Sequence, residues 1–532
     1  MQQNILQSWA DDEWPVIRKS KPLPTGEGVL DQGAFDAIEV DELFDNVNYA
    51  NTIAGQTVLY RSLTQPLDNL DAIAAKQQAV REIRDNPDVR ANVENIVSNA
   101  VTGESRLYLL LFGEFLGGFG TAREDNQIEG YGYKQYRRGI NAVLNLVGAI
   151  QNSGTPQSPY LQSVFNKIAS FAQSNDYSLM VGPVYNSEKG IQSKEERKNS
   201  FSPATIFRPT LFKPLLIGML LAAIWGVVKI FPTDMFQFSK DGISVASVFF
   251  FPLMFAYIPI IGGYDKENCI IPLRNRFKSS QALGELLDGL GQLDELLAFI
   301  KYAEAYGSET ILPDMQATDH HSMNLVGAKN PVLGHKNPEY VANDFAMEED
   351  RLICVTGPNS GGKTAFCKTV TQVQLLAQIG CYVPAKSAKL SVADKIFYQA
   401  PEISHLDDGE GRFGTELKRT RDIFLASTAK SLLVLDEMAE GTTFEEKMQS
   451  SIDVLDGFYR KGNSTILITH NHQLVDVFVK RGTTTPKQVE FADDLPTFKL
   501  IPGISRVSHA DRVAKKIGFS KQDIENYLTK ST

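Results

Sequence analysis

Short apolar runs alternate with longer amphipathic stretches in the C-terminal part of the chain. Residues 352–355, 431–437 and 465–470 are predicted to be buried strands, because each contains a run of aliphatic side chains. Residues 365–379 and 416–428 are predicted to be helices, since their apolar positions recur at helical spacing. Strands that alternate with helices are typical of an α/β domain.

Two runs further upstream contain no charged side chain. The first has 15 residues, from 214 to 228, and the second has 21 residues, from 242 to 262. About 20 apolar residues span a bilayer, so we expect an inserted transmembrane helical hairpin within residues 206–265. Lysines and arginines on its outer flanks predict an integral membrane protein whose flanking domains lie in the cytoplasm. A buried helical hairpin or a partner-binding surface is the alternative.

A glycine-rich segment follows the first predicted strand. Residues 356–364 contain the pattern G-x-x-x-x-G-K-[ST], which ends in Lys363 and Thr364. Glycines let backbone N–H groups approach phosphate oxygens, and the N-terminus of the following helix adds a partial positive charge. We expect Lys363 to contact the β- and γ-phosphates of ATP and Thr364 to bind Mg²⁺. A chance glycine-rich turn is the structural alternative.

The other two predicted strands end in polar side chains that suit the same chemistry. Asp436 and Glu437 end the second strand, and His470 ends the third. We expect Asp436 to bind Mg²⁺, Glu437 to polarise the attacking water and His470 to contact the γ-phosphate. The sequence therefore predicts an ATPase with Glu437, His470 and Lys363 as catalytic residues. A solvated acidic turn and a structural histidine are the alternatives.

These motifs resemble those of the MutS family of ATPases. Residues 357–364 are similar to the family's GPNxGGK[ST] P-loop, residues 436–442 to its DE-x-x-x-GT segment, and residues 469–470 to its terminal TH pair. In the family an aromatic residue stacks on adenine, and the resemblance assigns this role to Tyr340. It also implies a homodimer that uses ATP and Mg²⁺. The residues expected to bind the nucleotide are Gly357, Pro358, Asn359, Gly361, Gly362, Lys363, Thr364, Ala365, Tyr340, Gly411 and Phe413.

One expected contact between subunits departs from the family pattern. The family's signature loop carries a Ser-Thr-Phe run that meets the γ-phosphate of the opposite subunit, and residues 409–416 are the best match here. Phe413 and Glu416 fit, but Gly411 stands where the serine would be. The backbone N–H of Gly411 and the charge of Arg412 could still contact the nucleotide across a dimer. A flexible loop without nucleotide contact is the alternative.

The N-terminal half resembles the core and lever regions of MutS more weakly. The likeness covers residues 45–130 and 280–525. Residues 1–40 are too few for the family's N-terminal mismatch-reading domain, so mismatch reading is not expected. The letters F-x-E of that domain occur at residues 112–114, but they follow an apolar stretch that is predicted to pack as buried helix.

Composition and charge bear on the choice of partner. The 532 residues indicate several domains, and the formal net charge of −10 gives the whole chain no basic footprint for nucleic acid. Residues 131–138 are a local candidate, because Lys134, Arg137 and Arg138 alternate there with tyrosines, as on surfaces that stack bases. A solvated loop is the preferred alternative, and anionic lipid is another partner for the same charges.

We therefore predict a multidomain protein with an α-helical core and lever region, an inserted transmembrane hairpin and a C-terminal α/β P-loop ATPase domain. The predicted parts are an arm at 1–40, a helical core and lever at 41–205, the hairpin at 206–265, lever return helices at 266–318 and the ATPase domain at 319–532. One functional hypothesis is a dimeric, membrane-anchored MutS-like ATPase that binds branched or damaged DNA and is related to DNA mismatch repair. The other is a nucleotide-driven membrane switch or assembly scaffold that does not bind DNA.

Overall fold

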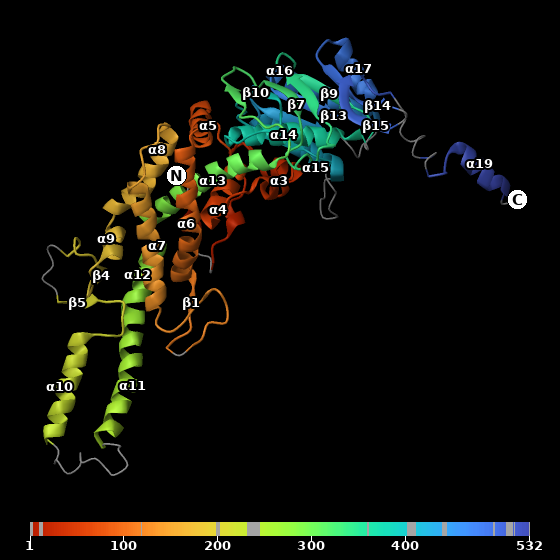
Figure 1. Ribbon diagram of the computed structural model, residues 1–532. Helices are drawn as coiled ribbons and strands as arrows, with labels where there is room; N and C mark the ends of the chain where they lie inside the picture. The colour runs from red at the N-terminus through yellow and green to blue at the C-terminus, as the bar shows by residue number, and fades with distance from the viewer. Residues whose placement is uncertain are drawn as a thin grey trace. The chain divides into compact units, whose positions relative to one another are not determined.

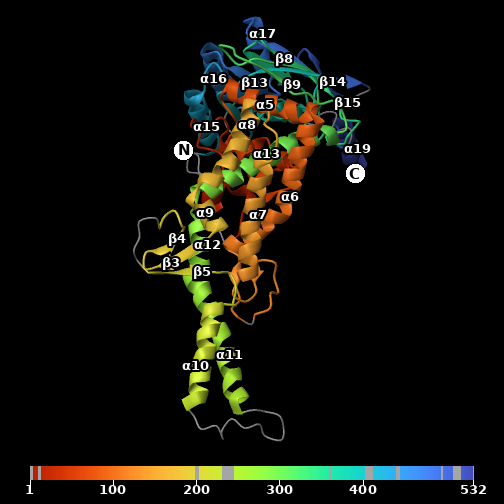
Figure 2. The ribbon, with the colours of Figure 1, turned by 60° about the vertical axis from the view of Figure 1, so that its left-hand side comes forward.

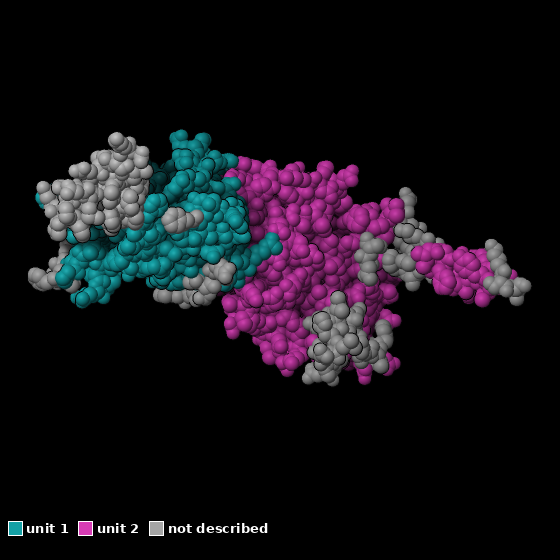
Figure 3. All heavy atoms as spheres, turned by 90° about the horizontal axis from the view of Figure 1, so that it is seen from below, with its two compact units in different colours: residues 1–19, 50–58, 82–297 teal, residues 20–49, 59–81, 298–532 magenta. Residues whose placement is uncertain are grey.

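The chain folds into two compact units, each assembled from several separate segments (Figure 3). Unit 1 comprises residues 1–19, 50–58 and 82–297, and unit 2 comprises residues 20–49, 59–81 and 298–532. The five-part organisation predicted above stays a prediction. The computed structural model describes residues 4–9, 14–118, 120–197, 203–230, 245–358, 361–401, 411–438, 444–492, 495–506, 514 and 517–530.

Unit 1 is predominantly helical, and its longest helix is α6 (Pro87–Phe112) (Figures 1 and 2). The Asn86 side chain caps α6 by accepting hydrogen bonds from two backbone N–H groups, and proline suits the first turn that follows. α6 packs against α7 (Tyr133–Gln151). Glycine makes this contact close, because a Cβ at Gly139 would lie 2.9 Å from Cδ2 of Leu110.

Two predictions for this region have opposite outcomes. Residues 110–112 are buried at the end of α6, which confirms that the apolar stretch with Phe112 packs in a core, whereas Glu114 is exposed in β1. The preferred reading of residues 131–138 as a loop is wrong, because α7 begins at Tyr133. The basic side chains of this segment therefore lie on the first turns of a helix.

The remaining elements of unit 1 are shorter, and three helices run through both units. The helices of unit 1 are α1 (Ile5–Trp9), α8 (Pro159–Ala169), α9 (Asn175–Val181), α10 (Pro214–Ile230), α11 (Val245–Asp265) and α12 (Ile271–Lys278). Its shorter helical turns are Ile17–Lys19, Ser170–Gln173 and the π-helix Lys266–Ile270. Its strands are β1 (Glu114–Phe115), β2 (Gln127–Ile128), β3 (Val184–Ser187), β4 (Gly190–Gln192) and β5 (Ala204–Phe207). The shared helices are α4 (Ile53–Thr64), α5 (Leu70–Asp85) and α13 (Gln281–Ala305).

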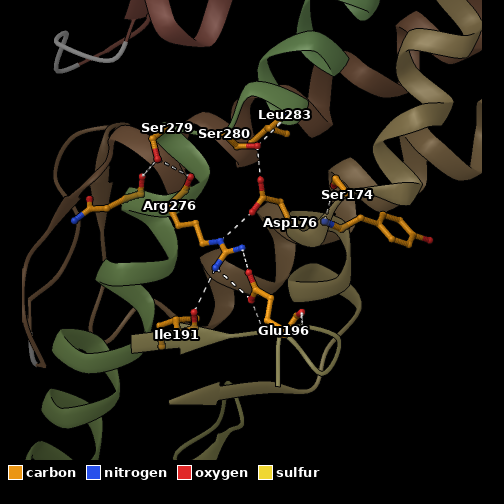
Figure 4. Close-up of polar contacts among 11 residues, drawn as sticks. Ser174, Asp176, Ile191, Glu196, Arg276, Ser279, Ser280 and Leu283 are labelled. Carbon is orange, nitrogen blue, oxygen red and sulfur yellow. Dashed lines mark hydrogen bonds and ion pairs between the residues drawn. The ribbon is translucent and has the colours of Figure 1, made fainter. Parts of the chain in front are cut away.

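An arginine of α12 fastens the β3–β4–β5 sheet region to the helices (Figure 4). The Arg276 guanidinium donates to Asp176 Oδ1 at 3.0 Å, to Glu196 Oε1 at 2.6 Å and to the carbonyl oxygen of Ile191 at 3.3 Å. Burial alone would raise the pKa of Glu196, but hydrogen bonds from Arg276 and Ser193 lower it below its usual value. The ionised carboxylate is therefore the form that unit 1 stabilises.

A buried pair of carboxylates holds the start of α4. Glu104 of α6 accepts hydrogen bonds from the backbone N–H groups of Ile53 and Ala54, at 2.8 and 2.7 Å, and from the Tyr108 hydroxyl at 2.5 Å. Asp294 of α13 accepts from the Thr52 backbone N–H and hydroxyl, both at 2.7 Å. The two side chains thereby satisfy backbone donors that a helix N-terminus leaves without partners.

The uncharged runs form two neighbouring helices, α10 and α11 (Figures 1 and 2), but the predicted transmembrane hairpin is wrong. Within the described ranges no helix is both long enough and apolar enough to cross a membrane. α10 has 17 residues, or about 26 Å at 1.5 Å per residue, against about 30 Å of hydrocarbon. α11 ends in Asp265, which forms an ion pair with Lys213 at 2.7 Å. The predicted membrane location and lipid partner rested on this hairpin and are withdrawn with it.

Unit 2 contains the predicted α/β domain. Its six-stranded sheet has the order β11–β12–β13–β9–β14–β15, and all neighbours are parallel except β14 and β15. The central strands β9 (Leu352–Thr356), β12 (Leu432–Asp436) and β13 (Ser464–Ile468) are buried along their whole length. Parallel strands that are covered on both faces are nearly continuous aliphatic runs, which explains why the sequence pattern located them.

Unit 2 also contains a second, four-stranded sheet of order β6–β10–β7–β8. The remaining strands of the unit are β6 (Asp314–Gln316), β7 (Met323–Ala328), β8 (Asn343–Met347), β10 (Ser387–Ser391), β11 (Ile396–Gln399), β14 (Thr485–Ala492) and β15 (Leu495–Pro502). The helices are α2 (Gln32–Ala37), α3 (Val40–Val47), α14 (Lys363–Gln378), α15 (Gly411–Ala426), α16 (Phe444–Lys461), α17 (His472–Lys480) and α19 (Lys521–Lys530).

Candidate functional site

The glycine-rich segment joins β9 directly to α14, and β14 presses against it. A Cβ at Gly357 or Gly361 would lie 3.1 or 3.0 Å from Cγ2 of Val489, so neither position has room for a side chain. Gly357 and Gly362 have φ angles of 139° and 83°, which side chains rarely allow. Gly362 is the N-cap of α14, so the glycine-rich segment leads directly into a helix N-terminus, where phosphate groups bind favourably.

Lys363, the first residue of α14, lies buried beneath this turn. Its Nζ donates to the carbonyl oxygen of Gly357 at 2.7 Å and lies 3.5 Å from Nε2 of His470. Burial lowers the pKa of Lys363, while the charges of Glu437 and Asp436 act in the opposite direction. The ammonium group is thus positioned by a backbone carbonyl and balanced by two acids.

Thr364 and Asp436 meet at the ends of α14 and β12. The Thr364 hydroxyl donates to Oδ2 of Asp436 across 3.1 Å. Adjacent ligands of an octahedral Mg²⁺, each about 2.0–2.1 Å from the metal, lie about 2.9 Å apart, so this spacing fits the ion. Burial raises the pKa of Asp436, and the charge of Glu437 adds to this effect. A cation between these two oxygens would favour the ionised carboxylate.

Glu437 and His470 form a pair at the neighbouring strand ends. Nε2 of His470 lies 2.8 Å from Oε1 of Glu437. Glu437 has a φ angle of 53°, in the left-handed region where a side chain is strained. Its backbone N–H is held by the carbonyl oxygen of Ile468 at 3.0 Å. The strained conformation turns the chain sharply after β12 and directs the carboxylate toward the histidine.

A cavity of about 290 Å³ adjoins this pair and leaves room for water beside the carboxylate. Sequence reasoning missed four of its lining residues, Lys447, Asn471, His472 and Gln473. Asn471 also caps α17, because its side chain accepts a hydrogen bond from the backbone N–H of Leu474 at 3.1 Å. An asparagine just before an amphipathic stretch is a helix-start signal that could have revealed it.

The predicted adenine-stacking residue, Tyr340, is half-buried next to α14. Its hydroxyl lies 3.5 Å from Oγ1 of Thr369. The same threonine accepts a hydrogen bond from the Asn330 side chain at 3.0 Å. Burial raises the pKa of Tyr340, which keeps the phenol neutral. The stacking role stays a prediction.

The signature-loop residues begin a helix, since α15 starts at Gly411, five residues before the predicted start. Phe413 packs against the hydrophobic core of unit 2. The backbone carbonyl of Glu416 accepts a hydrogen bond from the Thr420 hydroxyl at 2.8 Å. The predicted contact with a second subunit stays untested.

The structure thus links Lys363, His470 and Glu437 by contacts and pairs Thr364 with Asp436, and the charges of Asp436 and Glu437 both act on Lys363. Two further predicted residues lie beside these groups, Pro358 within the glycine-rich segment and Ala365 in the first turn of α14. The Pro358 carbonyl accepts a hydrogen bond from the Gly361 N–H at 3.0 Å. The Ala365 carbonyl accepts one from the Thr369 hydroxyl at 2.8 Å. Asn359, also predicted to bind nucleotide, lies outside the described residues.

Comparison with known proteins finds similarity in this part of the chain. Residues 353–529 match the family model of MutS domain V. The DNA mismatch repair protein MutS of Parabacteroides distasonis is 32% identical over 248 residues, which are 44% of this chain and 28% of that protein. The DNA mismatch repair protein MSH3 of Phaeosphaeria nodorum is 34% identical over 198 residues, which are 36% of this chain and 17% of that protein.

A relative named for a different activity also matches. Endonuclease MutS2 of Listeria innocua is 30% identical over 239 residues, which are 44% of this chain and 30% of that protein. Each of these alignments spans less than a third of the relative's length. The family-model match, over residues 353–529, covers the P-loop, Asp436, Glu437 and His470.

Proposed function

We propose that this chain, whose residues 353–529 match the model of MutS domain V, is a Mg²⁺-dependent ATPase that acts as a dimer and binds DNA, in a role related to mismatch repair. The observation that carries the proposal is the convergence of Lys363, the Thr364–Asp436 pair and the Glu437–His470 pair at the ends of β9, β12 and β13. These are the groups that phosphoryl transfer to water requires.

ATP is the substrate, and its phosphates would lie against the glycine turn. Lys363 would exchange its 2.7 Å hydrogen bond to the Gly357 carbonyl for contacts with β- and γ-phosphate oxygens. Thr364 and Asp436 would hold Mg²⁺, which offsets phosphate charge when it is bound. Tyr340 would stack on the adenine ring.

Glu437 would position the attacking water. In the structure its carboxylate is engaged by His470 at 2.8 Å, so the two side chains must separate, or share the water, before Glu437 can act as a base. His470 also lies 3.5 Å from Lys363. It is therefore placed to respond when a γ-phosphate draws the lysine away.

Dimerisation and DNA binding rest on the family, whose members named above are mismatch repair proteins and an endonuclease. In a dimer, Gly411 and Phe413 of one subunit would face the nucleotide of the other. The second candidate is an assembly switch that uses the same motor without DNA. The net charge of −10 favours this alternative, because it gives no overall attraction to a polyanion.

The test is the ATPase rate of the purified full chain, measured without DNA and with duplex, mismatched and branched DNA. Glu437→Gln should bind ATP yet hydrolyse it on the order of 100- to 10,000-fold more slowly, because it lacks the general base. Glu445→Gln, the same change at an exposed position on α16, is the matched control. Normal turnover by Glu437→Gln would remove Glu437 from its role, and a rate indifferent to every DNA would favour the assembly switch.

A further inference from the structure

A polar groove runs between α6 and α7 in unit 1, whereas every residue of the ATP motifs belongs to unit 2. Its volume is about 670 Å³, within the range of about 300–1,000 Å³ that small-ligand sites occupy. Neither the ATPase motifs nor the family resemblance accounts for it. Its main polar lining residues are Asn99, Thr102, Arg106, Arg138, Asn141 and Asn145.

Two arginines, Arg106 of α6 and Arg138 of α7, line this groove. The helices pack closely here, since a Cβ at Gly139, the residue after Arg138, would lie 3.2 Å from the backbone carbonyl oxygen of Arg106. Within the described part of the chain, neither guanidinium has a hydrogen bond or an ion pair. Both residues are exposed, so an anion can reach them from solvent, and it would offset two like charges in one groove.

No carboxylate lines the groove to supply that negative charge. α7 contains neither aspartate nor glutamate in any of its residues. Glu104 of α6 is buried, and its oxygens accept hydrogen bonds from Ile53, Ala54 and Tyr108. The charges of Arg106 and Arg138 are therefore available to an anionic ligand. The planar guanidinium group, with its parallel N–H donors, suits phosphate in particular.

The rest of the groove suits a polar group attached to that phosphate. The floor is built from small residues, since a Cβ at Gly103 would lie 3.1 Å from the Cβ of Ala142. Asn141 and Asn145 lie one helical turn apart on α7, and Asn99 approaches from α6. An asparagine both donates and accepts hydrogen bonds, so these side chains can bind sugar hydroxyls or the edge of a base.

We propose that this groove binds a phosphate ester of nucleotide size, with Arg106 and Arg138 on the phosphate and the asparagines on the remainder. The same chemistry is offered by a free mononucleotide and by one nucleotide of a nucleic-acid strand. The proposal is independent of the ATPase assignment, because it uses none of the residues of that site.

The experiment measures binding by the full chain, with its ATP site saturated by ADP and Mg²⁺. The probes are AMP and a short single-stranded oligonucleotide, each titrated by calorimetry. Arg106→Gln/Arg138→Gln should weaken the bound probe about 10-fold or more, since each charged hydrogen bond contributes about 1.5–3 kcal/mol. The matched control is Arg90→Gln on the same helix, whose guanidinium pairs with Glu94 at 2.9 Å.

The two probes distinguish the sources of the phosphate. AMP binding that the double variant loses identifies a small-ligand site. Binding of the oligonucleotide alone identifies a strand site, and the slope of log affinity against log salt should then fall by about 0.7 for each lost phosphate contact. Circular dichroism and an unchanged ATPase rate verify that the double variant is folded.

Two results would overturn the groove assignment: no binding of either probe to the wild type, or equal binding by the wild type and the double variant. An inactive ATPase that still binds a probe through the arginines would refute the proposed function alone. The two failures are therefore distinguishable.

Discussion

Replacing Glu104 by glutamine should remove a specific pH dependence from the stability of unit 1. Burial raises the pKa of Glu104 from 4.5 to about 7, against the hydrogen bonds that it accepts from Tyr108, Ala54 and Ile53. Between these two pH values the folded state keeps a proton that the unfolded state has lost. Stability must therefore fall as the pH rises through this window, by about 3 kcal/mol for a shift of about 2.5 units at 1.36 kcal/mol each.

Trp9 offers a local reporter for this transition. Its ring contacts Tyr108 edge-to-face, with centroids 5.3 Å apart, and Tyr108 donates to Glu104. Urea unfolding would be followed by Trp9 fluorescence between pH 4.5 and 8, after Trp14 and Trp225 are changed to phenylalanine. The neutral glutamine should leave stability flatter with pH than the wild type.

The control is Glu94→Gln, on the same helix but only partly buried, which should keep the pH profile of the wild type. The informative quantity is the difference in unfolding free energy between Glu104→Gln and the wild type, followed as a function of pH. A difference that stays constant from pH 4.5 to 8 would show that Glu104 ionises normally in the folded state. The hydrogen bonds at the start of α4 would then outweigh burial.

Three further predictions concern single contacts. Arg276→Gln should destabilise unit 1 by about 1–3 kcal/mol in urea unfolding at neutral pH. Because the pKa of Glu196 is lowered from 4.5 in the folded state, this loss of stability should become smaller in acid. A loss that is unchanged in acid would contradict the pairing of Arg276 with Glu196. Gly361→Ala should destabilise unit 2 by about 1–3 kcal/mol through overpacking, because its Cβ would lie 3.0 Å from Cγ2 of Val489. In a double-mutant cycle with Val489→Ala, the losses in melting temperature should be less than additive, and full additivity would contradict the clash. Tyr340→Ala should weaken ATP binding about 2- to 12-fold in a fluorescent-nucleotide assay, whereas Tyr340→Phe, which keeps the ring, should bind ATP like the wild type. Equal ATP affinities of Tyr340→Ala and the wild type would exclude stacking.

The sequence alone located the α/β domain and its glycine turn, because both are specified by patterns of residues that are close together in the chain. A strand buried on both faces must be aliphatic throughout, and a P-loop requires glycine where φ is positive and β14 approaches. Residues 110–112 could be assigned to a core for the same reason, since an apolar helical run has few alternatives. The helix starts were placed less well, as α15 begins at Gly411 rather than at Glu416.

The tertiary structure decided which side chains meet. Glu437 and His470 are 33 positions apart, and only the parallel pairing of β12 with β13 brings them to 2.8 Å. The hairpin prediction failed because it rested only on the absence of charged residues from two runs. Crossing a membrane depends on the length and apolar character of the helices that these runs form. The sequence pattern singled out Arg138 but not Arg106, since the two residues line one groove only where α6 and α7 pack together. Local patterns specify elements, but distances between elements follow from packing.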